Sequence, residues 1–198
     1  MKIGVFGGTF DPPHLGHLIL ADEALNQLDL EIVLWIPASN PPHKPKKNVS
    51  DVQSRLELVK AAIQDNSHFE MSRIDVDRPP PHYAVDTMKI LKIFRPEDEL
   101  TYLMGGDSAE NLNKWYKPGK FLDLCDGLGV MSRPGTELVF GNLEKLVPGI
   151  SKKIMIIETP LIDISGSQIR RKIKKGLSYR YYLPENVFRI VEEKMLYR

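Results

Sequence analysis

The chain has 198 residues, of which 42% are apolar and 27% are charged, so it suits one globular domain with a substantial core. Its formal net charge of +1 gives no electrostatic case for a nucleic-acid polymer or an anionic membrane as the main partner. The single cysteine, Cys125, excludes an internal disulfide framework and a multi-thiolate zinc site, and we expect it to serve packing.

The first predicted element is a short buried strand, Lys2–Phe6, which begins directly after Met1. Apolar residues from Leu18 to Leu28 then recur at helical spacing. The stretch between them, 7–17, is therefore a strand-to-helix turn, where backbone amides and the positive end of a helix point at a ligand. Within it Asp11 is the predicted N-cap, followed by a proline in the first helical turn.

The residues of this turn suit phosphate. Gly7 and Gly8 let the backbone approach a bulky anion, and Thr9 adds a hydroxyl donor. His14 and His17 lie three apart, share one helical face and can donate to a phosphoryl group as its negative charge grows. Two alternatives remain: the histidines could bind a metal ion, or they could simply lie at the start of a helix. No thiol or carboxylate cluster nearby completes a metal site. The order of the glycines is not that of a dinucleotide fingerprint.

The second predicted strand, Glu31–Ile36, leads into a polar, proline-rich loop from Ala38 to Ser50. Prolines around Asn40 stiffen this loop, so Lys44 can be presented to a phosphate with less entropy to lose. A solvated basic loop is the alternative.

Predicted helices and strands also alternate through the middle of the chain. A helix capped by Ser50 or Asp51 is predicted to turn Leu56, Val59, Ala62 and Ile63 inward. The short strand Phe69–Ser72 follows, and Arg78–His82 must be an extended loop because of its three prolines. A helix is predicted over Ala84–Phe94.

A fourth strand, Leu100–Met104, ends in glycines and starts a helix. Asp107 there suits ribose hydroxyls or an N-cap, and both can hold. Trp115 offers a flat face for an aromatic base, with plain core packing as the alternative. Strands at Gly127–Met131 and Lys153–Ile157 and a closing helix at Pro184–Leu196 complete the pattern.

The stretch Ile164–Arg170 opens a short helix that stops at Gly176. Ser165 and Gln168 form a capping box, Ile169 and Ile173 point inward, and the basic run Arg171, Lys172, Lys174 and Lys175 forms an outer face. Free amides, hydroxyls and Arg170 at this helix start predict a second anion site, although a well-capped helix alone would explain the pattern.

The alternation of strands and helices predicts an α/β fold, a Rossmann-like doubly wound, mostly parallel sheet with helices on both faces, as a single domain over 1–198. Open sheets of this class bind ligands at the carboxyl ends of their strands. The loops after Phe6, Ile36, Met104 and Ile157 should therefore converge on one crevice. No signal peptide or membrane-length apolar run is present in the sequence, so a cytoplasmic protein is expected.

The string Gly7-Gly8-Thr9-Phe10-Asp11-Pro12-x-His14-x-Gly16-His17 resembles the signature of the nucleotidylyltransferase superfamily, whose mark is His-x-Gly-His. Its longer form resembles the bacterial nicotinate-nucleotide adenylyltransferases in particular. The resemblance implies adenylyl transfer from ATP to nicotinate mononucleotide in NAD biosynthesis, with Mg²⁺ carried by ATP. It also implies that the C-terminal helical part, about 165–198, completes the ATP site, and it leaves a homo-oligomer open.

The resemblance assigns site residues by position. Its implied catalytic residues are His14, His17, Lys44 and Arg170. Its implied ATP ligands are Gly7, Gly8, Thr9, Phe10, His17, Gly105, Asp107, Ile164, Ser165, Ser167 and Arg170. Its implied mononucleotide ligands are Asn40, Lys44, Tyr83, Ala84, Thr87, Asp107, Trp115, Tyr116 and Arg133.

The chain departs from the family pattern in two places. Gly166 and Ser167 stand where the second motif, Ile-Ser-Ser-Thr-x-Ile-Arg, has serine and threonine, and Ala84 replaces a threonine near the nicotinate carboxylate. Other functions remain alternatives to adenylyl transfer to nicotinate mononucleotide. They are transfer to nicotinamide mononucleotide or phosphopantetheine, cytidylyl transfer, and binding of a nucleotide as a non-catalytic sensor. Trp115 and the segment 83–87 favour a pyridine nucleotide.

Overall fold

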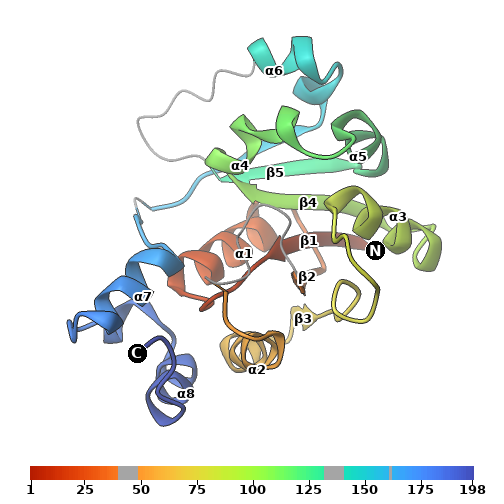
Figure 1. The fold of residues 1–198 in the computed structure, drawn as a ribbon. Helices are drawn as coiled ribbons and strands as arrows, with labels where there is room; N and C mark the ends of the chain where they lie inside the picture. Colours follow the sequence, from red (N-terminus) through yellow and green to blue (C-terminus); the bar gives the residue numbers. More distant parts are fainter. Residues whose placement is uncertain (40–48, 132–140, 161) are drawn as a thin grey trace.

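The computed structural model describes residues 1–39, 49–131, 141–160 and 162–198. Six strands in these ranges form one sheet, all parallel, in the order β3-β2-β1-β4-β5-β6 (Figure 1). The strands are β1 (Lys2–Gly8), β2 (Ile32–Pro37), β3 (Phe69–Met71), β4 (Glu99–Gly105), β5 (Gly127–Met131) and β6 (Ile154–Ile157). Each strand predicted from the sequence is present, and the order is that of a doubly wound sheet.

Helices cover both faces of this sheet. They are α1 (Leu15–Gln27), α2 (Val52–Ile63), α3 (Ala84–Phe94), α4 (Gly106–Glu110), α5 (Pro118–Leu124), α6 (Gly141–Leu146), α7 (Gly166–Lys174) and α8 (Glu185–Glu193). Buried residues of α1, α2, α7 and α8 form one apolar core with one face of the strands. Those of α3, α4 and α5 form a second core on the other face, which includes the buried Cys125. The predicted α/β fold is confirmed.

The two cores follow from the alternation of side chains along each strand. In β2, Val33 and Trp35 enter the first core, whereas Ile32, Leu34 and Ile36 enter the second. A continuous apolar run is therefore needed here, because both faces of the strand are covered. The same alternation in β4 sends Tyr102 to the face that carries α3 and α5.

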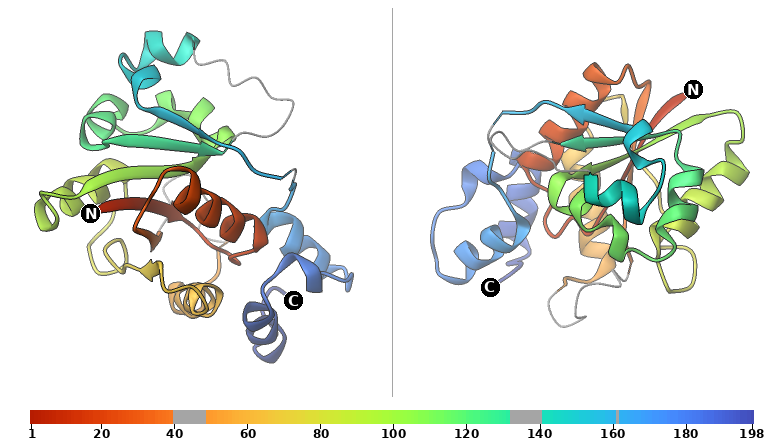
Figure 2. Two further views of the ribbon diagram at one scale, coloured as in Figure 1. Left: turned by 180° about the vertical axis from the view of Figure 1, so that it is seen from behind. Right: turned by 90° about the horizontal axis from the view of Figure 1, so that it is seen from above.

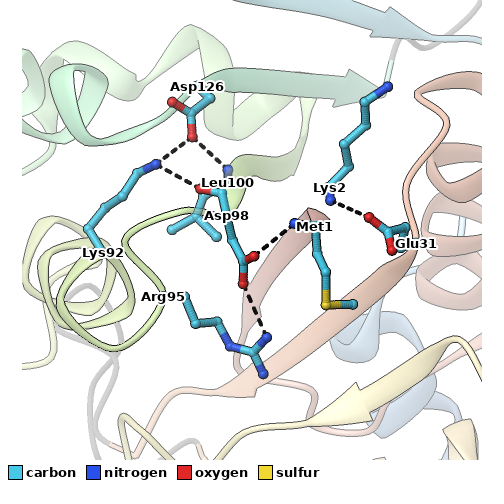
Figure 3. Close-up of polar contacts among 8 residues, drawn as sticks. All are labelled: Met1, Lys2, Glu31, Lys92, Arg95, Asp98, Leu100 and Asp126. Atoms are coloured by element: carbon cyan, nitrogen blue, oxygen red, sulfur yellow. Dashed lines mark hydrogen bonds and ion pairs between the residues drawn. The ribbon is translucent and has the colours of Figure 1, made fainter.

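Ion pairs fasten the amino-terminal edge of the sheet (Figure 3). The amino group of Met1 lies 2.8 Å from the Asp98 carboxylate. Lys92 Nζ lies 2.6 Å from Asp126, whose carboxylate also accepts a hydrogen bond from the backbone N–H of Leu100. These contacts lie at the edge opposite the predicted crevice, so they hold strands in register without entering it.

The C-terminal helices lie beside α1 and α2 rather than over the centre of the sheet (Figures 1 and 2). Ile169 and Ile173 of α7 are buried, as predicted, and Val187 and Val191 bury the inner face of α8. The basic residues Arg171 and Lys174 of α7, and Lys175 just after it, are exposed as predicted, whereas Lys172 of the same basic run is half-buried. This arrangement brings the start of α7 to the carboxyl end of the sheet.

Two predicted helix starts are wrong. Helix α1 begins at Leu15 with His14 at its N-cap, so Asp11 is not the cap. Instead, the Asp11 carboxylate accepts hydrogen bonds from the backbone N–H of Ser50 and from the Tyr197 hydroxyl. Because these partners lie far away in sequence, local pattern alone could not show them. Similarly, Gly105 rather than Asp107 precedes α4, and Asp107 lies in its first turn.

Three other helices differ from expectation. The short helices α5 and α6 were not predicted. The closing helix α8 ends at Glu193, three residues before the predicted end. Among the helices that the structure describes, none is long and apolar enough to cross a bilayer.

Candidate active site

A cleft of about 610 Å³ opens at the carboxyl ends of the strands. Its floor includes the ends of β1 and β4, which are neighbours in the sheet. The strands that follow β1 in sequence, β2 and β3, lie on one side of this pair, and those that follow β4, β5 and β6, lie on the other. Doubly wound sheets place their ligands at this switch point. Three wall segments surround it: the turn after β1 with the start of α1, the start of α7, and a wall from α3, β4 and Trp115.

The two histidines of the motif are stacked at the start of α1. Their ring centroids are 3.7 Å apart, with 23° between the ring planes. The backbone N–H of His14 donates to Nδ1 of His17 over 3.2 Å. Because an N–H can only donate, Nδ1 of a neutral His17 is the acceptor and Nε2 carries the proton. His17 is thereby fixed in the form that presents a donor.

The ring of Phe10 packs against one ring of this pair. Phe10 is buried and packs edge-on against His17, with 5.1 Å between centroids, and against Phe6 at 5.3 Å. Its φ of 48° turns the chain sharply after the glycines. Phe10 was predicted to contact ATP; it lines the cleft, and its ring also belongs to the first apolar core and packs against His17.

Burial lowers the pKa of His14 from 6.5 to about 4. The unfolded chain therefore binds one more proton than the folded chain between these values, and this part of the stability is present above pH 6.5 and lost as the pH falls toward 4. We expect the free energy of unfolding to fall by up to about 1.4 kcal/mol per pH unit in that window. Denaturant titrations at several pH values would measure it, and His14→Gln should flatten the slope. Equal slopes in both proteins would contradict this.

Asp11 connects the glycine turn to α7 and to the C-terminal segment. Asp11 is 5% exposed, and its carboxylate lies 3.1 Å from the Ser50 backbone nitrogen and 2.8 Å from the Tyr197 hydroxyl. Arg170 reaches it at 3.8 Å and also donates to its backbone carbonyl over 2.5 Å. Arg170 therefore spans from α7 to the turn and lines the cleft between them.

The start of α7 has the geometry that the capping box predicts. The backbone N–H of Gln168 donates to Ser165 Oγ, and the backbone N–H of Ser165 donates to the Gln168 side chain. Gly166 faces the turn so closely that a Cβ atom there would lie 2.8 Å from the Asp11 carbonyl oxygen. This contact explains why glycine interrupts the serine-rich motif.

Arg55 is a site residue that the sequence analysis missed. It is 1% exposed and donates to four backbone carbonyls, those of Thr9, Ala38, Ser39 and Ser50, over 2.7 to 3.1 Å. These carbonyls belong to the glycine turn and to both ends of the segment that carries Lys44. Its spacing with Val59 and Ala62 places Arg55 on the inner face of α2, which was the available signal.

The opposite wall of the cleft holds a buried polar network. Thr87 Oγ1 donates to Asp75 over 2.7 Å, and Arg78 pairs with the same carboxylate at 2.9 Å. Arg78 also donates to the carbonyl of Pro81 over 2.7 Å. These bonds fix the proline-rich loop against the start of α3, so Ala84 and Thr87 face the cleft.

Trp115 lines the same wall. It packs against Tyr102 with 5.9 Å between centroids and against Phe121 at 5.3 Å. Trp115 is half-buried: it contacts the second core and also borders the cleft. Its position is therefore compatible with both predicted roles, stacking on an aromatic base and packing in the core.

Most predicted site residues that the structure describes border this one cleft. They are Gly7, Gly8, Thr9, Phe10, His14, His17, Ala84, Thr87, Gly105, Trp115, Ile164, Ser165, Ser167 and Arg170. Asp107, Tyr83 and Tyr116 are not among its lining residues; the two tyrosines stack on each other at 4.3 Å. Asn40, Lys44 and Arg133 lie outside the described residues.

Comparison with known proteins identifies the family. The family model described as cytidylyltransferase-like matches residues 5–172. The nicotinate-nucleotide adenylyltransferase of Bacillus subtilis is 38% identical over 196 residues, covering 99% of this chain and 98% of that protein. A probable nicotinate-nucleotide adenylyltransferase of Thermomicrobium roseum is 39% identical over 197 residues, covering 100% of this chain and 92% of that protein.

The fold also has a solved counterpart. The structure of Plasmodium falciparum nicotinic acid mononucleotide adenylyltransferase complexed with NaAD has a TM-score of 0.79 and 17% sequence identity, over 99% of this chain and 97% of that one. This likeness supports the fold, whereas the sequence relatives define the family. The chain belongs to the cytidylyltransferase-like family and, within it, to the nicotinate-nucleotide adenylyltransferases.

Proposed function

We propose that this chain transfers the adenylyl group of ATP to nicotinate mononucleotide, giving nicotinate adenine dinucleotide and pyrophosphate. The observation that carries the proposal is the shape of the cleft: donors for phosphate on the α1 and α7 side face an aromatic and polar wall on the α3 side. A cleft with two such walls suits the joining of two nucleotides.

The reaction is a direct displacement at phosphorus. A 5′-phosphate oxygen of the mononucleotide forms a bond to the α-phosphorus of ATP, the bond from that phosphorus to the bridging oxygen breaks, and pyrophosphate leaves with the electron pair. No step requires a covalent bond to the protein. Positioning and stabilisation of charge supply the rate, as is general for phosphoryl chemistry.

Different residues of the chain have different roles in this reaction. His17 Nε2–H donates to the phosphate on which charge builds, while the buried neutral His14 holds His17 in place by stacking. Arg170 and the amides at the start of α7 bind the departing pyrophosphate. Lys44 and Arg133, from segments outside the described residues, are proposed to add positive charge around the same phosphates.

Mg²⁺ is proposed to enter with ATP. No group of three His, Cys, Asp or Glu side chains within the described ranges could hold a metal ion. Mg²⁺ retains several waters and needs few carboxylates, so oxygens of the triphosphate fit it better than this cleft does. The ion would neutralise phosphate charge.

A pyrophosphate-release assay tests the proposal. The protein is incubated with Mg²⁺ and ATP, and with nicotinate mononucleotide, nicotinamide mononucleotide or phosphopantetheine in turn; CTP replaces ATP in a parallel set. We expect release with ATP and a pyridine mononucleotide. Saturable ATP binding without release from any acceptor would instead indicate a nucleotide sensor.

A further inference from the structure

The Asp11 side chain is enclosed where three segments of the chain meet. One carboxylate oxygen accepts a hydrogen bond from the Tyr197 hydroxyl over 2.8 Å, and the other accepts one from the backbone N–H of Ser50 over 3.1 Å. The guanidinium of Arg170 lies 3.8 Å from this second oxygen and donates to the Asp11 backbone carbonyl. The Asp11 side chain is 2% exposed, so these contacts rather than bulk water set its orientation.

The segment that follows α8 brings Tyr197 to this position, beside α7 (Figures 1 and 2). Met195 and Tyr197 have positive φ angles of 50° and 68°, which are uncommon for residues with a side chain. The backbone N–H of Leu196 donates to the Val191 carbonyl over 3.0 Å, and the side chains of Leu196 and Tyr197 pack against the first core. Such backbone conformations persist only where the surrounding structure fixes them. The contacts of this segment therefore hold Tyr197 against the glycine turn.

Tyr197 is the donor in its bond to Asp11. Burial raises the pKa of the Tyr197 hydroxyl, and the negative charge of Asp11 and the hydrogen bond to it raise this pKa further. A hydrogen bond with the Ser50 side chain acts in the opposite direction and is the smaller effect. The hydroxyl therefore keeps its proton and donates it to the carboxylate. Each carboxylate oxygen of Asp11 thus has a neutral donor.

Arg170 is shared between Asp11 and the cleft. Its side chain is 26% exposed and lines the cleft where phosphate is proposed to bind. A guanidinium carries five N–H donors, and the bond to the Asp11 carbonyl uses one of them. Because neutral donors pair with both carboxylate oxygens, the remaining donors of Arg170 are left for a ligand. Arg55 cannot replace it, since Arg55 donates to four backbone carbonyls.

We infer that Tyr197 is a positioning residue, which keeps Arg170 available to ATP by pairing with the Asp11 carboxylate. Without the hydroxyl, one oxygen of this buried carboxylate would lack its donor, which is unfavourable. Charge-assisted N–H···O bonds are about 2.7–2.9 Å long, so a shift of about 1 Å would bring Arg170 into such a bond with Asp11. The guanidinium would then turn toward Asp11 and away from the phosphates. The identity of ATP as the ligand rests on the proposed function.

Tyr197→Phe tests this inference because it removes only the hydroxyl. We expect the Kd for ATP with Mg²⁺, measured by calorimetry without an acceptor, to rise about tenfold, since one charge-assisted hydrogen bond to phosphate is weakened. The KM for ATP should rise by a similar factor, while the KM for nicotinate mononucleotide should change less than about twofold. Tyr181→Phe, at a tyrosine that is 84% exposed, is the matched control and should change none of these values.

Two further backgrounds show whether Arg170 mediates the effect. Asp11→Asn removes the charge that would attract the guanidinium, and Arg170→Met removes the guanidinium itself. In either background, adding Tyr197→Phe should change the Kd for ATP less than about twofold, because residues that act through one another have non-additive effects. The melting temperature is measured for every variant. A purely structural Tyr197 would lower the melting temperature and change the Kd for ATP by the same factor in all three backgrounds.

The outcomes separate this inference from the proposed function. If the unaltered protein binds ATP but releases no pyrophosphate with any acceptor, the proposed function fails, and the ATP titrations still decide the role of Tyr197. If Tyr197→Phe binds ATP within about twofold of normal, or if the tenfold loss persists when Asp11 or Arg170 is replaced, the positioning role of Tyr197 is overturned. A protein that binds no ATP would overturn both.

Discussion

His17→Ala is expected to lower kcat about a hundredfold or more while ATP still binds. The imidazole is fixed by the His14 N–H and by the stacked His14 ring, so Nε2–H is already oriented before the phosphate gains charge. A donor fixed in this way acts mainly on the transition state, and its removal should reduce turnover more than ground-state affinity. Steady-state kinetics together with calorimetric ATP titration would measure both quantities.

His17→Asn provides the control for structure. Asparagine can accept the His14 N–H with its side-chain oxygen, so the helix start should be kept, but it places no donor where Nε2–H lies. We expect its turnover to be as low as that of His17→Ala, with stability close to that of the unaltered chain. Turnover within threefold of normal in either variant would remove His17 from the proposed mechanism.

Arg55→Met is expected to have the largest effect on stability. Methionine fills a similar volume but leaves the carbonyls of Thr9, Ala38, Ser39 and Ser50 without their donor in a buried site. Each unpaired buried carbonyl costs about 1–3 kcal/mol, although water can reach some of them after relaxation. A loss of about 3 kcal/mol or more in the free energy of unfolding is the expected result, measured by denaturant titration.

Arg189→Met is the matched control for this substitution. Arg189 lies on α8, has a side chain 66% exposed and pairs with Glu185 one turn earlier. Surface pairs of this kind contribute less than about 1 kcal/mol, so the control should remain close to normal. If the two variants lost equal stability, the bonds of Arg55 to the four carbonyls would not explain its effect.

The sequence predicted the strands of the sheet well because their signal is local. Buried parallel strands read as continuous apolar runs, and β2 and β5 lie within one residue of expectation at each end. Ser165 and Gln168 likewise form the predicted capping box, since both partners lie within one turn. Local chemistry decides such features, so a local pattern suffices.

The errors arose where distant residues compete for a side chain. Asp11 looks like an N-cap, but it bonds Ser50 and Tyr197, which lie 39 and 186 residues away. Arg55 looks like an ordinary helix cation, yet its partners come from two other loops. Tyr102 reads as strand packing, and only the fold shows that it also lines the cleft.

The division of the interior into two cores has a consequence for how such enzymes diversify. The sheet separates the apolar layer beneath His14, His17 and α7 from the layer beneath Tyr102 and Trp115. Substitutions in the second layer can reshape the wall proposed to bind the acceptor, while the residues proposed to bind the nucleoside triphosphate keep their own support. Specificity for the acceptor could therefore change in evolution through substitutions in one wall alone. Mutant libraries confined to α3, β4 and the segment around Trp115 would test the same change in the laboratory.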